Sequence, residues 1–583
     1  MTEPNEPSYS QFACIGSGFS AIGLGATLQR WYGISDIRFF ERHSDLGGTW
    51  FINQYPGCAC DVPSALYSFS FECNPSWSRV LPTSNELRAY LRHVAEKYDL
   101  PAKMTFGTNV EKCEWVEEKG RWRLTTRDLA TEMVSVHECQ FLFSGSGHFT
   151  TPRTLDVPGT ETFEGPVIHS GRWKPEVDLT NKRVVLFGNG CTGAQIVPAI
   201  VKKTRHLTQV VRSKHWVLPP VDKKMPAAAR WVFTHVPGTM LLQRVICFSV
   251  AEIDFLGFSN SKLGVAWRRW RQGQAETYMR QTAPAKYHDL LIPEFELNCK
   301  RRIFDSGYLA SLHSKNMTLT DDRGVEVLPQ GVRMASGKVV DADVIVLANG
   351  FNTNAYLSGV DVVGRGGETL GQHFESFGGP EAYNCSALSG FPNFFILLGP
   401  NTATGHTSAI LAVENSINYA LRVLKPVLEG KAAIADLKRP AEGAYVEKIQ
   451  DALQDTVWTS GCNSWYVRSD KGNRTWNGMS YPWSQGYYWW SSVFPVWKDW
   501  SFTGKTGKST IVKRHRSGLL IAVFATLAVA LLAWAQEKPD SLLGSKLLEW
   551  FPRSDAIVSR LRVHTAGLLL TAQRLVSSAV SKT

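Results

Sequence analysis

The chain has 583 residues, of which 44% are hydrophobic, and a formal net charge of +11. Its length predicts more than one domain, and its hydrophobic content is that of a globular protein with a full core. The positive charges are spread along the chain without a long basic run, so nucleic acid is not expected as a partner. An anionic cofactor, a lipid headgroup surface or an ordinary solvated face are the remaining explanations of the excess charge.

The cysteines and the N-terminal residues indicate an intracellular protein. The 11 cysteines are scattered along the sequence, and the pair Cys58 and Cys60 has neither a zinc-site nor a thioredoxin spacing. We therefore expect reduced thiols and no metal site. The sequence begins with the polar, acidic stretch MTEPNEPSYS, which is not the pattern of a secretory signal peptide.

The first motif with a chemical meaning is a glycine-rich turn near the start of the chain. Residues 11–15 read as a short buried strand, and residues 37–40 read as a second strand that ends at Glu41. Between them a helical pattern is preceded by the turn Gly16-Ser17-Gly18-Phe19-Ser20-Ala21. Glycines at such a turn let the backbone approach a pyrophosphate at a helix N-terminus, and Glu41 would accept hydrogen bonds from ribose hydroxyls. An acid there disfavours a 2′-phosphate, so the motif predicts FAD or NAD.

Two longer patterns come next. Residues 47–61 read G-G-x-W-x-x-x-x-Y-P-G-x-x-x-D and end at Asp61. After a region that alternates like antiparallel strands, residues 163–173 read F-x-G-x-x-x-H-x-x-x-W, and the named positions are Phe163, Gly165, His169 and Trp173. Each pattern alone has a simpler explanation, namely a surface carboxylate in a loop and an ordinary linker.

A second nucleotide turn follows. Residues 183–187 are a strongly apolar strand, and Gly188-Asn189-Gly190-Cys191-Thr192-Gly193 is a complete G-x-G-x-x-G before a helix. The next strand, residues 209–211, ends at Arg212 instead of an acid. This favours a cofactor with a 2′-phosphate, which is NADPH, although an arginine is also common at a solvated strand end.

In order and spacing, these motifs resemble those of Baeyer–Villiger monooxygenases, the flavin enzymes that insert oxygen beside a ketone. The resemblance covers roughly residues 10 to 500. Related flavin N- and S-oxygenases generally lack the signature at residues 47–61, so this signature favours the first class. Two positions depart from the family pattern: Lys174 follows Trp173 where Pro or Asp is usual, and Asn349 replaces a Thr in residues 348–351, A-N-G-F.

The resemblance implies a set of cofactor contacts. FAD would be contacted by Gly16, Gly18, Phe19, Ser20, Ala21, Glu41, Thr49, Trp50, Asp61, Tyr67 and Val110. NADPH would be contacted by Ala59, Cys60, Asp61, Phe187, Gly188, Asn189, Gly190, Cys191, Thr192, Gly193, Val211 and Arg212. For Val110, a plain core valine is the alternative.

The resemblance also implies a catalytic arginine. Residues 299–305 read C-K-R-R-I-F-D, and their alignment with the family gives the role to Arg301, with Arg302 as the competitor. A fixed guanidinium stays protonated beside an anion and stabilises the negative charge that forms on oxygen during the reaction. Asp61 would orient this guanidinium. A surface basic pair is the simpler explanation.

Two C-terminal regions complete the pattern. Residues 458–500 contain eight tryptophans, and we interpret them as the wall of a large apolar pocket, with core packing or aromatics at a membrane surface as alternatives. Residues 518–535 carry no charge and follow Lys513, Arg514 and Arg516. This predicts a single membrane span with the catalytic domains on the cytosolic side and lipid as a partner. An amphipathic or partner-binding helix is the alternative.

We therefore predict an α/β fold with two Rossmann-like dinucleotide-binding domains, a helical insert and a C-terminal membrane helix. The expected parts are residues 1–160 and 346–512 for the FAD domain, 161–345 for the NADPH domain with its insert at about 220–298, 517–536 for the membrane helix and 537–583 for a tail. The expected activity is Baeyer–Villiger oxidation of a bulky apolar ketone with O2. The alternatives are a flavin N- or S-oxygenase or hydroxylase, and a membrane-anchored flavoprotein that does not oxygenate.

Overall fold

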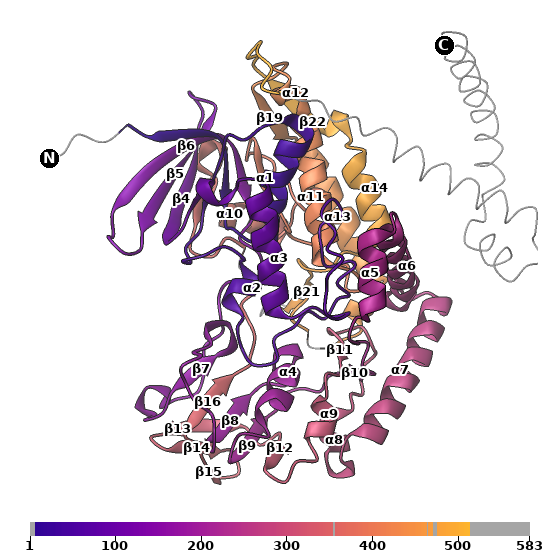
Figure 1. Cartoon of the computed structure of the whole chain (residues 1–583). Helices are drawn as coiled ribbons and strands as arrows, with labels where there is room; N and C mark the ends of the chain where they lie inside the picture. The colour runs from indigo at the N-terminus through magenta and orange to yellow at the C-terminus, as the bar shows by residue number, and fades with distance from the viewer. Residues whose placement is uncertain (1–5, 354–355, 463, 470–474, 513–583) are drawn as a thin grey trace, which may run out of the picture. The chain divides into compact units, whose positions relative to one another are not determined.

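An eight-stranded sheet carries the first nucleotide motif (Figure 1). The computed structural model describes residues 6–353, 356–462, 464–469 and 475–512. Strand β1 pairs in parallel with β2 on one side and with β6 on the other, while β4, β5 and β6 are antiparallel. The strands are β1 (Ser8–Ile15), β2 (Ile37–Phe40), β3 (Met104–Thr105), β4 (Thr108–Val116), β5 (Arg121–Asp128), β6 (Val134–Ser144), β17 (Asp361–Val363) and β18 (Phe394–Ile396).

The core of this first unit lies between the sheet and three helices. Helix α1 (Phe19–Tyr32) packs against α3 (Ser84–Lys97) and α11 (Ala409–Val423). On the sheet, Phe12, Phe141 and Phe143 are fully buried beneath these helices, and burying a phenylalanine contributes about 1.5–3 kcal/mol. The expected strands at residues 11–15 and 37–40 are thereby confirmed.

A second, entirely parallel sheet carries the second nucleotide motif. Its order is β12-β9-β8-β16-β7. The two central strands β8 and β16 are buried and apolar, except for Arg183 at the start of β8, because both faces of the sheet are covered. The bounds are β7 (Val167–His169), β8 (Arg183–Phe187), β9 (His206–Val210), β12 (Met317–Thr320) and β16 (Val344–Leu347), and helix α4 spans Cys191–Ile200. The α/β class with two Rossmann-like units is therefore confirmed.

A helical insert interrupts the second unit. It leaves after β10 (Val217–Leu218) and returns at β11 (Ile303–Phe304), and these two short strands pair in parallel. Its helices are α5 (Ala227–His235), α6 (Thr239–Asp254), η4 (Phe255–Phe258), α7 (Lys262–Thr282), η5 (Ala285–Tyr287) and α8 (His288–Leu291).

The remaining elements are short or peripheral. The helices are α2 (Thr49–Ile52), α9 (Tyr308–Ser311), α10 (Leu370–Phe377), α12 (Lys425–Leu428), α13 (Arg439–Gln454) and α14 (Gln485–Val493), with 3-10 turns η1 (Pro101–Lys103), η2 (Thr160–Thr162), η3 (Ser170–Arg172), η6 (Arg365–Gly367), η7 (Val457–Thr459) and η8 (Trp497–Asp499). The strands are β13 (Gly324–Leu328), β14 (Gly331–Met334), β15 (Val339–Asp341), β19 (Ile434–Leu437), β20 (Arg468–Ser469), β21 (Thr475–Trp476) and β22 (Trp500–Thr503).

The chain crosses between the two nucleotide units twice, and the two crossings are paired. Pro152 and Phe351 form an antiparallel bridge. The N–H of Arg153 donates to the carbonyl of Gly350 at 3.0 Å, and the N–H of Asn352 donates to the carbonyl of Thr151 at 2.9 Å. The chain therefore enters and leaves the second unit at one place.

Among the residues that the structure describes, no helix has the length and apolarity needed to cross a bilayer. The expected membrane helix at 517–536 and the tail at 537–583 lie outside those residues.

A fully buried cluster of charged side chains joins α10 to α13. His373 Nε2 lies 3.1 Å from Glu442 Oε1 and 3.2 Å from Glu381 Oε1, and all three side chains are 0% exposed. Burial alone would lower the pKa of His373, but the two carboxylates outweigh it and raise the pKa to about 9. Burial also raises the pKa of Glu381. The native state therefore holds protons here that the unfolded chain has released.

This cluster predicts a fall in folding stability as the pH rises. The stabilisation of the folded state by protonated His373 is fully present below the ordinary histidine pKa of 6.5, and it is lost as the pH rises through about 9. Glu381 acts in the same direction, because the folded state keeps its proton to a higher pH. We expect the unfolding free energy to drop by about 2 kcal/mol between pH 6 and pH 9, measured by urea denaturation. Glu381→Gln should flatten this dependence, and Glu375→Gln, at an exposed position of α10 two residues after His373, should not. An equal slope in all three proteins would contradict the assignment.

Candidate functional site

The first glycine turn is shaped for a phosphate. Gly16 has a φ of +102°, and a Cβ there would lie 2.7 Å from the carbonyl oxygen of Gly145, so only glycine fits. Gly18 is the N-cap of α1 and gives no side-chain cap, as expected of a glycine. Phe19, Ser20 and Ala21 form the first turn of α1, where backbone N–H groups point outward to an anion.

Glu41 follows β2 and is buried beside this turn. Its Oε2 accepts hydrogen bonds from the backbone N–H of Ser17 at 3.0 Å and from the Ser17 hydroxyl at 2.9 Å. Its Oε1 accepts a hydrogen bond from the N–H of His43 at 2.9 Å. The carboxylate thus stands at the turn, as the sequence motif requires, and it also holds the turn in shape.

The other predicted FAD contacts divide into two groups. Thr49 and Trp50 begin α2 beside this turn, and the ring of Tyr67 lies perpendicular to Trp50, with 5.5 Å between the ring centroids. Phe19 contacts the same tyrosine, with ring centroids 5.4 Å apart. Val110 instead is buried in the core of the sheet. It is therefore a packing residue, and its contact with FAD stays a prediction.

The second glycine turn has the same form. Gly188, which follows Phe187 at the end of β8, has a φ of +110°, and a Cβ there would lie 2.3 Å from the carbonyl oxygen of Ala348. Gly193 packs its Cα against the carbonyl of Gly188, where a Cβ would lie at 2.6 Å. A Cβ on Gly190, the N-cap of α4, would instead meet no heavy atom within 4 Å. The space above this helix start is therefore open to a ligand, and the turn fits a pyrophosphate.

The residues after β9 lie beside this turn. Val211 is buried, whereas Arg212 is exposed. The side-chain amide of Asn189 donates to the carbonyl of Ser213 at 2.8 Å and ties the turn to this strand end. Lys300, which the motif analysis used only for alignment, lies close enough for Arg212 to lower its pKa in addition to the effect of burial. Two cations thus converge at the edge of the second site.

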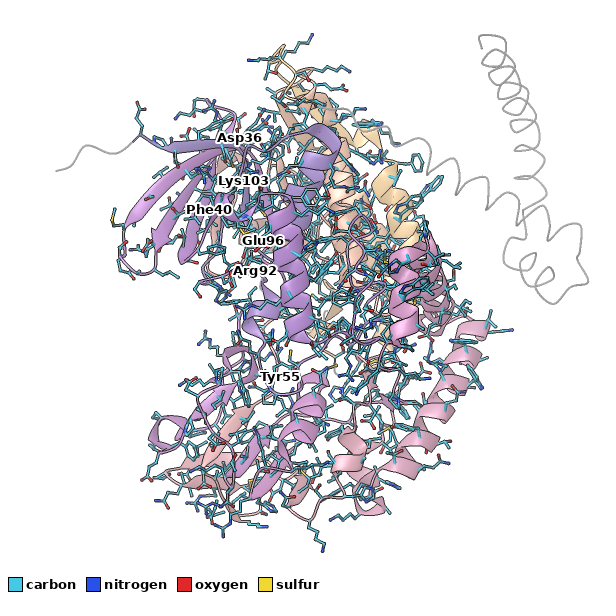
Figure 2. All side chains as sticks on the ribbon, viewed as in Figure 1. Asp36, Phe40, Tyr55, Arg92, Glu96 and Lys103 are labelled. Carbon is cyan, nitrogen blue, oxygen red and sulfur yellow. A yellow bond between two sulfur atoms is a disulfide. The ribbon has the colours of Figure 1, made fainter. Side chains whose placement is uncertain are left out.

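The two nucleotide units meet at residues 55–61. The hydroxyl of Tyr55 donates to Gln195 Oε1 at 2.8 Å, and Gln195 Nε2 donates to the carbonyl of Ala59 at 3.0 Å. Gly57 has a φ of +82°, and a Cβ there would lie 2.5 Å from the carbonyl oxygen of Gln195. Figure 2 shows Tyr55 between the upper and lower halves of the molecule. The Y-P-G part of the signature is therefore a contact between the two units.

Asp61 lies at this junction and pairs with Arg301. Arg301 Nε and Nη2 donate to Asp61 Oδ2 at 2.9 and 2.8 Å, and Nη1 donates to the carbonyl of Gly405 at 3.2 Å. The Asp61 carboxylate raises the pKa of Arg301 above its usual value. Burial and the Asp61 carboxylate raise the pKa of Cys191, the first residue of α4, to about 12. Cys60, the residue before Asp61, is buried and also senses both charges of the pair. One fixed cation thus stands at the junction of the two units, beside the start of α4.

Arg302 has a different environment. It is buried and pairs with Asp254 of the helical insert, and its Nη1 donates to Asn298 Oδ1 at 3.4 Å. Burial lowers its pKa, and Asp254 opposes that effect. Of the two competing arginines, Arg301 alone contacts Asp61 among the described residues, and Arg302 fastens the insert.

The fingerprint residues lie at the paired crossings. The His169 ring accepts a hydrogen bond at Nδ1 from the N–H of Gly171 at 3.0 Å, so Nε2 carries the proton and donates to the carbonyl of Gly350 at 3.0 Å. Phe163 packs into the core of the second unit, and a Cβ on Gly165 would lie 2.3 Å from the carbonyl oxygen of Asp343. Trp173 packs against the main core. His169 thus ties β7 to the exit crossing at Gly350, whereas Phe163, Gly165 and Trp173 are packing positions in this structure.

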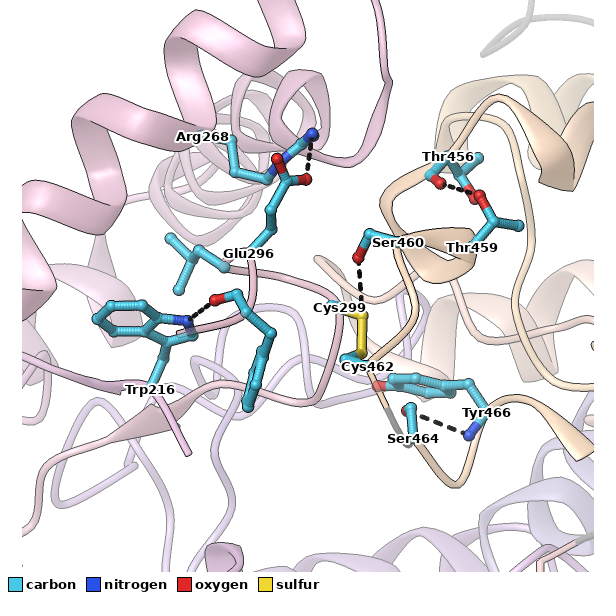
Figure 3. The surroundings of a disulfide bond; sticks show 12 residues. Trp216, Arg268, Glu296, Cys299, Thr456, Thr459, Ser460, Cys462, Ser464 and Tyr466 are labelled. Atoms are coloured by element: carbon cyan, nitrogen blue, oxygen red, sulfur yellow. Dashed lines mark hydrogen bonds and ion pairs between the residues drawn. A yellow bond between two sulfur atoms is a disulfide. The ribbon is translucent and has the colours of Figure 1, made fainter. Parts of the chain in front are cut away.

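One expectation was wrong: the cysteines are not all reduced. Cys299, two residues before Arg301, forms a disulfide with Cys462 (Figure 3). The hydroxyl of Ser460 donates to the Cys299 sulfur at 3.2 Å. Because the two cysteines are 163 residues apart in sequence, no local spacing marked them as partners. The bond fastens the loop that contains Tyr466 to the segment that carries the arginine.

The disulfide predicts a definite thiol count. Nine cysteines are free and two are bonded, so the urea-denatured protein should react with nine equivalents of a disulfide reagent, and with eleven after reduction. Because the bond closes a long loop, reduction should lower the unfolding free energy by about 2–4 kcal/mol. Cys462→Ser should reproduce this loss, with Cys73→Ser, at a partly exposed free cysteine, as control. Eleven reactive thiols without reduction would contradict the bond.

The tryptophan-rich region divides into three environments. Trp458 and Tyr466 belong to a cluster with Phe258, and burial raises the pKa of Tyr466 to about 12 in spite of the Arg301 charge beside it. This part lies beside the arginine. Tyr488 belongs to a buried core cluster, whereas Trp490 is 56% exposed. The interpretation of the region as the wall of an apolar pocket therefore stays a prediction.

Two residues close to the arginine, His406 and Glu252, belong to none of the sequence motifs described above. Arg301 contacts the carbonyl of Gly405, and the next residue, His406, has its Nε2 2.8 Å from Glu252 Oε1 of α6. Glu252 also accepts hydrogen bonds from the N–H groups of Gln485 and Gly486 at 3.0 and 3.2 Å. This carboxylate therefore connects the insert, the Gly405 turn and the start of α14.

Comparisons with known proteins agree with this geometry. Residues 11–244 match the model of the flavin-binding monooxygenase-like family. A Baeyer–Villiger monooxygenase of Streptomyces coelicolor is 36% identical over 475 residues, which cover 80% of this chain and 89% of the relative. A Baeyer–Villiger monooxygenase of Pseudomonas aeruginosa is 32% identical over 481 residues, covering 82% and 89%.

Solved structures show the same fold. The crystal structure of cyclohexanone monooxygenase from Rhodococcus sp. Phi1 bound to NADP+ superposes with a TM-score of 0.76 at 22% identity, and the match covers 86% of this chain and 100% of that one. The OTEMO complex with FAD and NADP superposes with a TM-score of 0.73 at 22% identity over 85% of this chain and 99% of that one.

Proposed function

This chain belongs to the family of Baeyer–Villiger monooxygenases, and from that premise we propose that it uses FAD and NADPH to insert one atom of O2 beside the carbonyl of a bulky apolar ketone, giving an ester or a lactone. The observation that carries the proposal is the Arg301–Asp61 pair, at the segment where the two nucleotide units meet. Each turn fits a dinucleotide, because it places a positive-φ glycine and a glycine N-cap at the start of a helix.

Each of the two turns would hold one cofactor. The first, with Glu41 beside it, would hold FAD, and the second would hold NADPH, with Arg212 and Lys300 against the 2′-phosphate. Bound FAD, reduced by NADPH, supplies the activated oxygen. The polypeptide binds both cofactors, orients the ketone and excludes water.

Arg301 would act on the charge that develops during oxygen insertion. Its guanidinium stays protonated at any working pH because Asp61 raises its pKa, so it stabilises negative charge on the reacting oxygen without giving up a proton. Asp61 and the Gly405 carbonyl fix its position and thereby act through it. The aromatic wall of Trp458 and Tyr466 supports an apolar substrate.

The test is product analysis with ¹⁸O2, NADPH and a panel of cyclic and polycyclic ketones. The expected product is an ester or lactone that carries one labelled oxygen atom. Labelled sulfoxides, N-oxides or alcohols without any ester would move the protein to the heteroatom-oxygenating or hydroxylating class. NADPH oxidation that no ketone stimulates, with all oxygen recovered as hydrogen peroxide, would favour a flavoprotein that does not oxygenate.

We further propose that residues 518–535 anchor the chain in a membrane, with the catalytic part in the cytosol. The support is the uncharged sequence of this stretch and the three cations that precede it. Alkaline carbonate extraction of membranes from expressing cells tests the anchor. The full chain is expected in the pellet, and complete release into the supernatant would refute a membrane span.

A further inference from the structure

Helix α6 of the insert has its apolar side outward. Leu241, Leu242, Val245, Ile246, Val250 and Ile253 are 40–63% exposed and form one stripe along the helix. The inward side combines Cys247, Phe248 and Ala251, which pack against the core, with two polar residues. Arg244 is the buried residue of α6 and donates to the carbonyls of Ala65 and Ser68 at 2.8 and 3.0 Å, and Glu252 accepts hydrogen bonds from the start of α14. A surface helix in water would have polar residues on its outer side.

The apolar face continues on two neighbouring helices. On α5, Trp231 is 59% exposed. On and after α14, exposed aromatic side chains are Tyr487, Trp489, Trp490, Phe494 and Trp497. Figure 1 shows α5, α6 and α14 at the same edge of the molecule, and the hydrogen bonds from Gln485 and Gly486 to Glu252 join α14 to α6. We call this surface the insert face. Patches of this kind mark interaction sites.

The charges of the insert face have one sign. Between residues 223 and 258 the acidic residues are Glu252 and Asp254, and both are turned inward, in pairs with His406 and Arg302. The exposed charges of this stretch are Lys223, Lys224 and Arg230. An apolar face with exposed tryptophans and a rim of cations matches the boundary between acyl chains and anionic headgroups.

We propose that the insert face lies on the surface of a lipid bilayer, with the α6 stripe dipping into the acyl-chain boundary. The chain continues for 71 residues after Val512 and includes the uncharged stretch 518–535, which supports a bilayer rather than another protein as the partner. This contact goes beyond the proposed activity and beyond the anchor, because it uses a separate part of the folded domain.

The contact has a consequence for the substrate. The inward side of α6 touches the site, since Glu252 contacts His406 and the adjacent Gly405 contacts Arg301. Helix α6 and the Gly405–His406 turn therefore stand between this face and the arginine. This deepens the proposed function and rests on it: the ketones that reach the site would be those dissolved in the bilayer.

Photolabelling of the full chain tests the contact. The protein is reconstituted into vesicles of phosphatidylcholine and phosphatidylserine that contain a phosphatidylcholine with a diazirine in its acyl chain, and labelled peptides are mapped after irradiation. We expect label in residues 227–254 and 485–497. Ile246→Glu/Val250→Glu should lower the labelling of α6 about tenfold, because two charges are excluded from the acyl region, and should leave the labelling of residues 518–535 unchanged.

The controls separate this proposal from misfolding and from the activity. Ile246 and Val250 are exposed, so the variant should keep its bound-flavin absorbance. Val325→Glu/Val339→Glu introduces the same charges at sites 45% and 46% exposed on β13 and β15 and should not change the labelling of α6. Label confined to residues beyond 512, or unchanged label in the Ile246→Glu/Val250→Glu protein, would overturn the proposal. So would cross-links that show a second copy or the chain's own tail on this face. None of these readouts depends on ketone oxidation.

Discussion

Replacing Arg301 with alanine is expected to lower ester formation about 10²–10³-fold, while NADPH oxidation continues and oxygen is recovered as hydrogen peroxide. The reason is that Asp61 and the Gly405 carbonyl hold the Arg301 cation at the junction of the two nucleotide units, so its loss removes charge stabilisation of the reacting oxygen. The measurement is ester yield per NADPH consumed, with a ketone that the unmodified protein converts.

Two further variants test whether the effect is specific to the Arg301 guanidinium. Arg301→Lys keeps the charge but cannot donate from both Nε and Nη2 to Asp61, so it should recover only a small part of the yield. Arg269→Ala removes an exposed arginine of α7 and should leave the yield unchanged. If Arg301→Ala formed ester at the normal rate, Arg301 would have no catalytic role. Arg302→Ala should instead lower stability, by about 1–3 kcal/mol, because Asp254 would keep only its more distant pair with Arg271 at 3.6 Å and its contact with Trp267.

The second large effect concerns the choice of cofactor. Arg212→Ala and Lys300→Ala should each raise KM for NADPH about 10–100-fold, since each removes one charged contact worth about 1.5–3 kcal/mol from the 2′-phosphate. KM for NADH should not rise, because NADH has no phosphate at that position. Arg212 already lowers the pKa of Lys300, so binding of an anion between them relieves a repulsion.

Steady-state kinetics with both cofactors checks this prediction. Lys214→Ala is the matched control, because Lys214 is a nearby lysine that pairs with Glu294 at 3.4 Å. Equal rises in KM for NADPH and NADH would mean that the two substitutions disturb the turn as a whole. An unchanged KM for NADPH in both variants would place the 2′-phosphate elsewhere.

The sequence was sufficient for the parts of the fold that local rules govern. The apolar strands at β1, β8 and β16 and the glycine turns at Gly16 and Gly188 follow from burial and from backbone geometry. The alignment also selected Arg301 over Arg302, and in the structure Arg301 contacts Asp61. Each of these features depends on a few neighbouring residues, so it can be predicted from the sequence alone.

Features that depend on distant residues could not be predicted. The partner of Cys299 is 163 residues away, and the link from Glu252 to His406 joins the insert to a turn far along the chain. Helix α6 was predicted as a helix, but periodicity does not tell which side faces the protein. The buried arginine, Arg244, decides that question, and its carbonyl partners lie in residues 65–68.

The paired crossings make the second nucleotide unit a module that can be transplanted. Its entry near Pro152 and its exit near Phe351 are hydrogen-bonded to each other, so both splice points of a chimera would coincide in space. A relative's segment grafted between them would have to match the host at this junction and at the contact of Tyr55 with Gln195. It would also have to match the host at the contacts of the insert, such as those of Arg244 and Glu252 and the Cys299–Cys462 disulfide. One exchange between these two splice points would therefore transfer the hydride-donor site of such a protein together with its insert and Arg301.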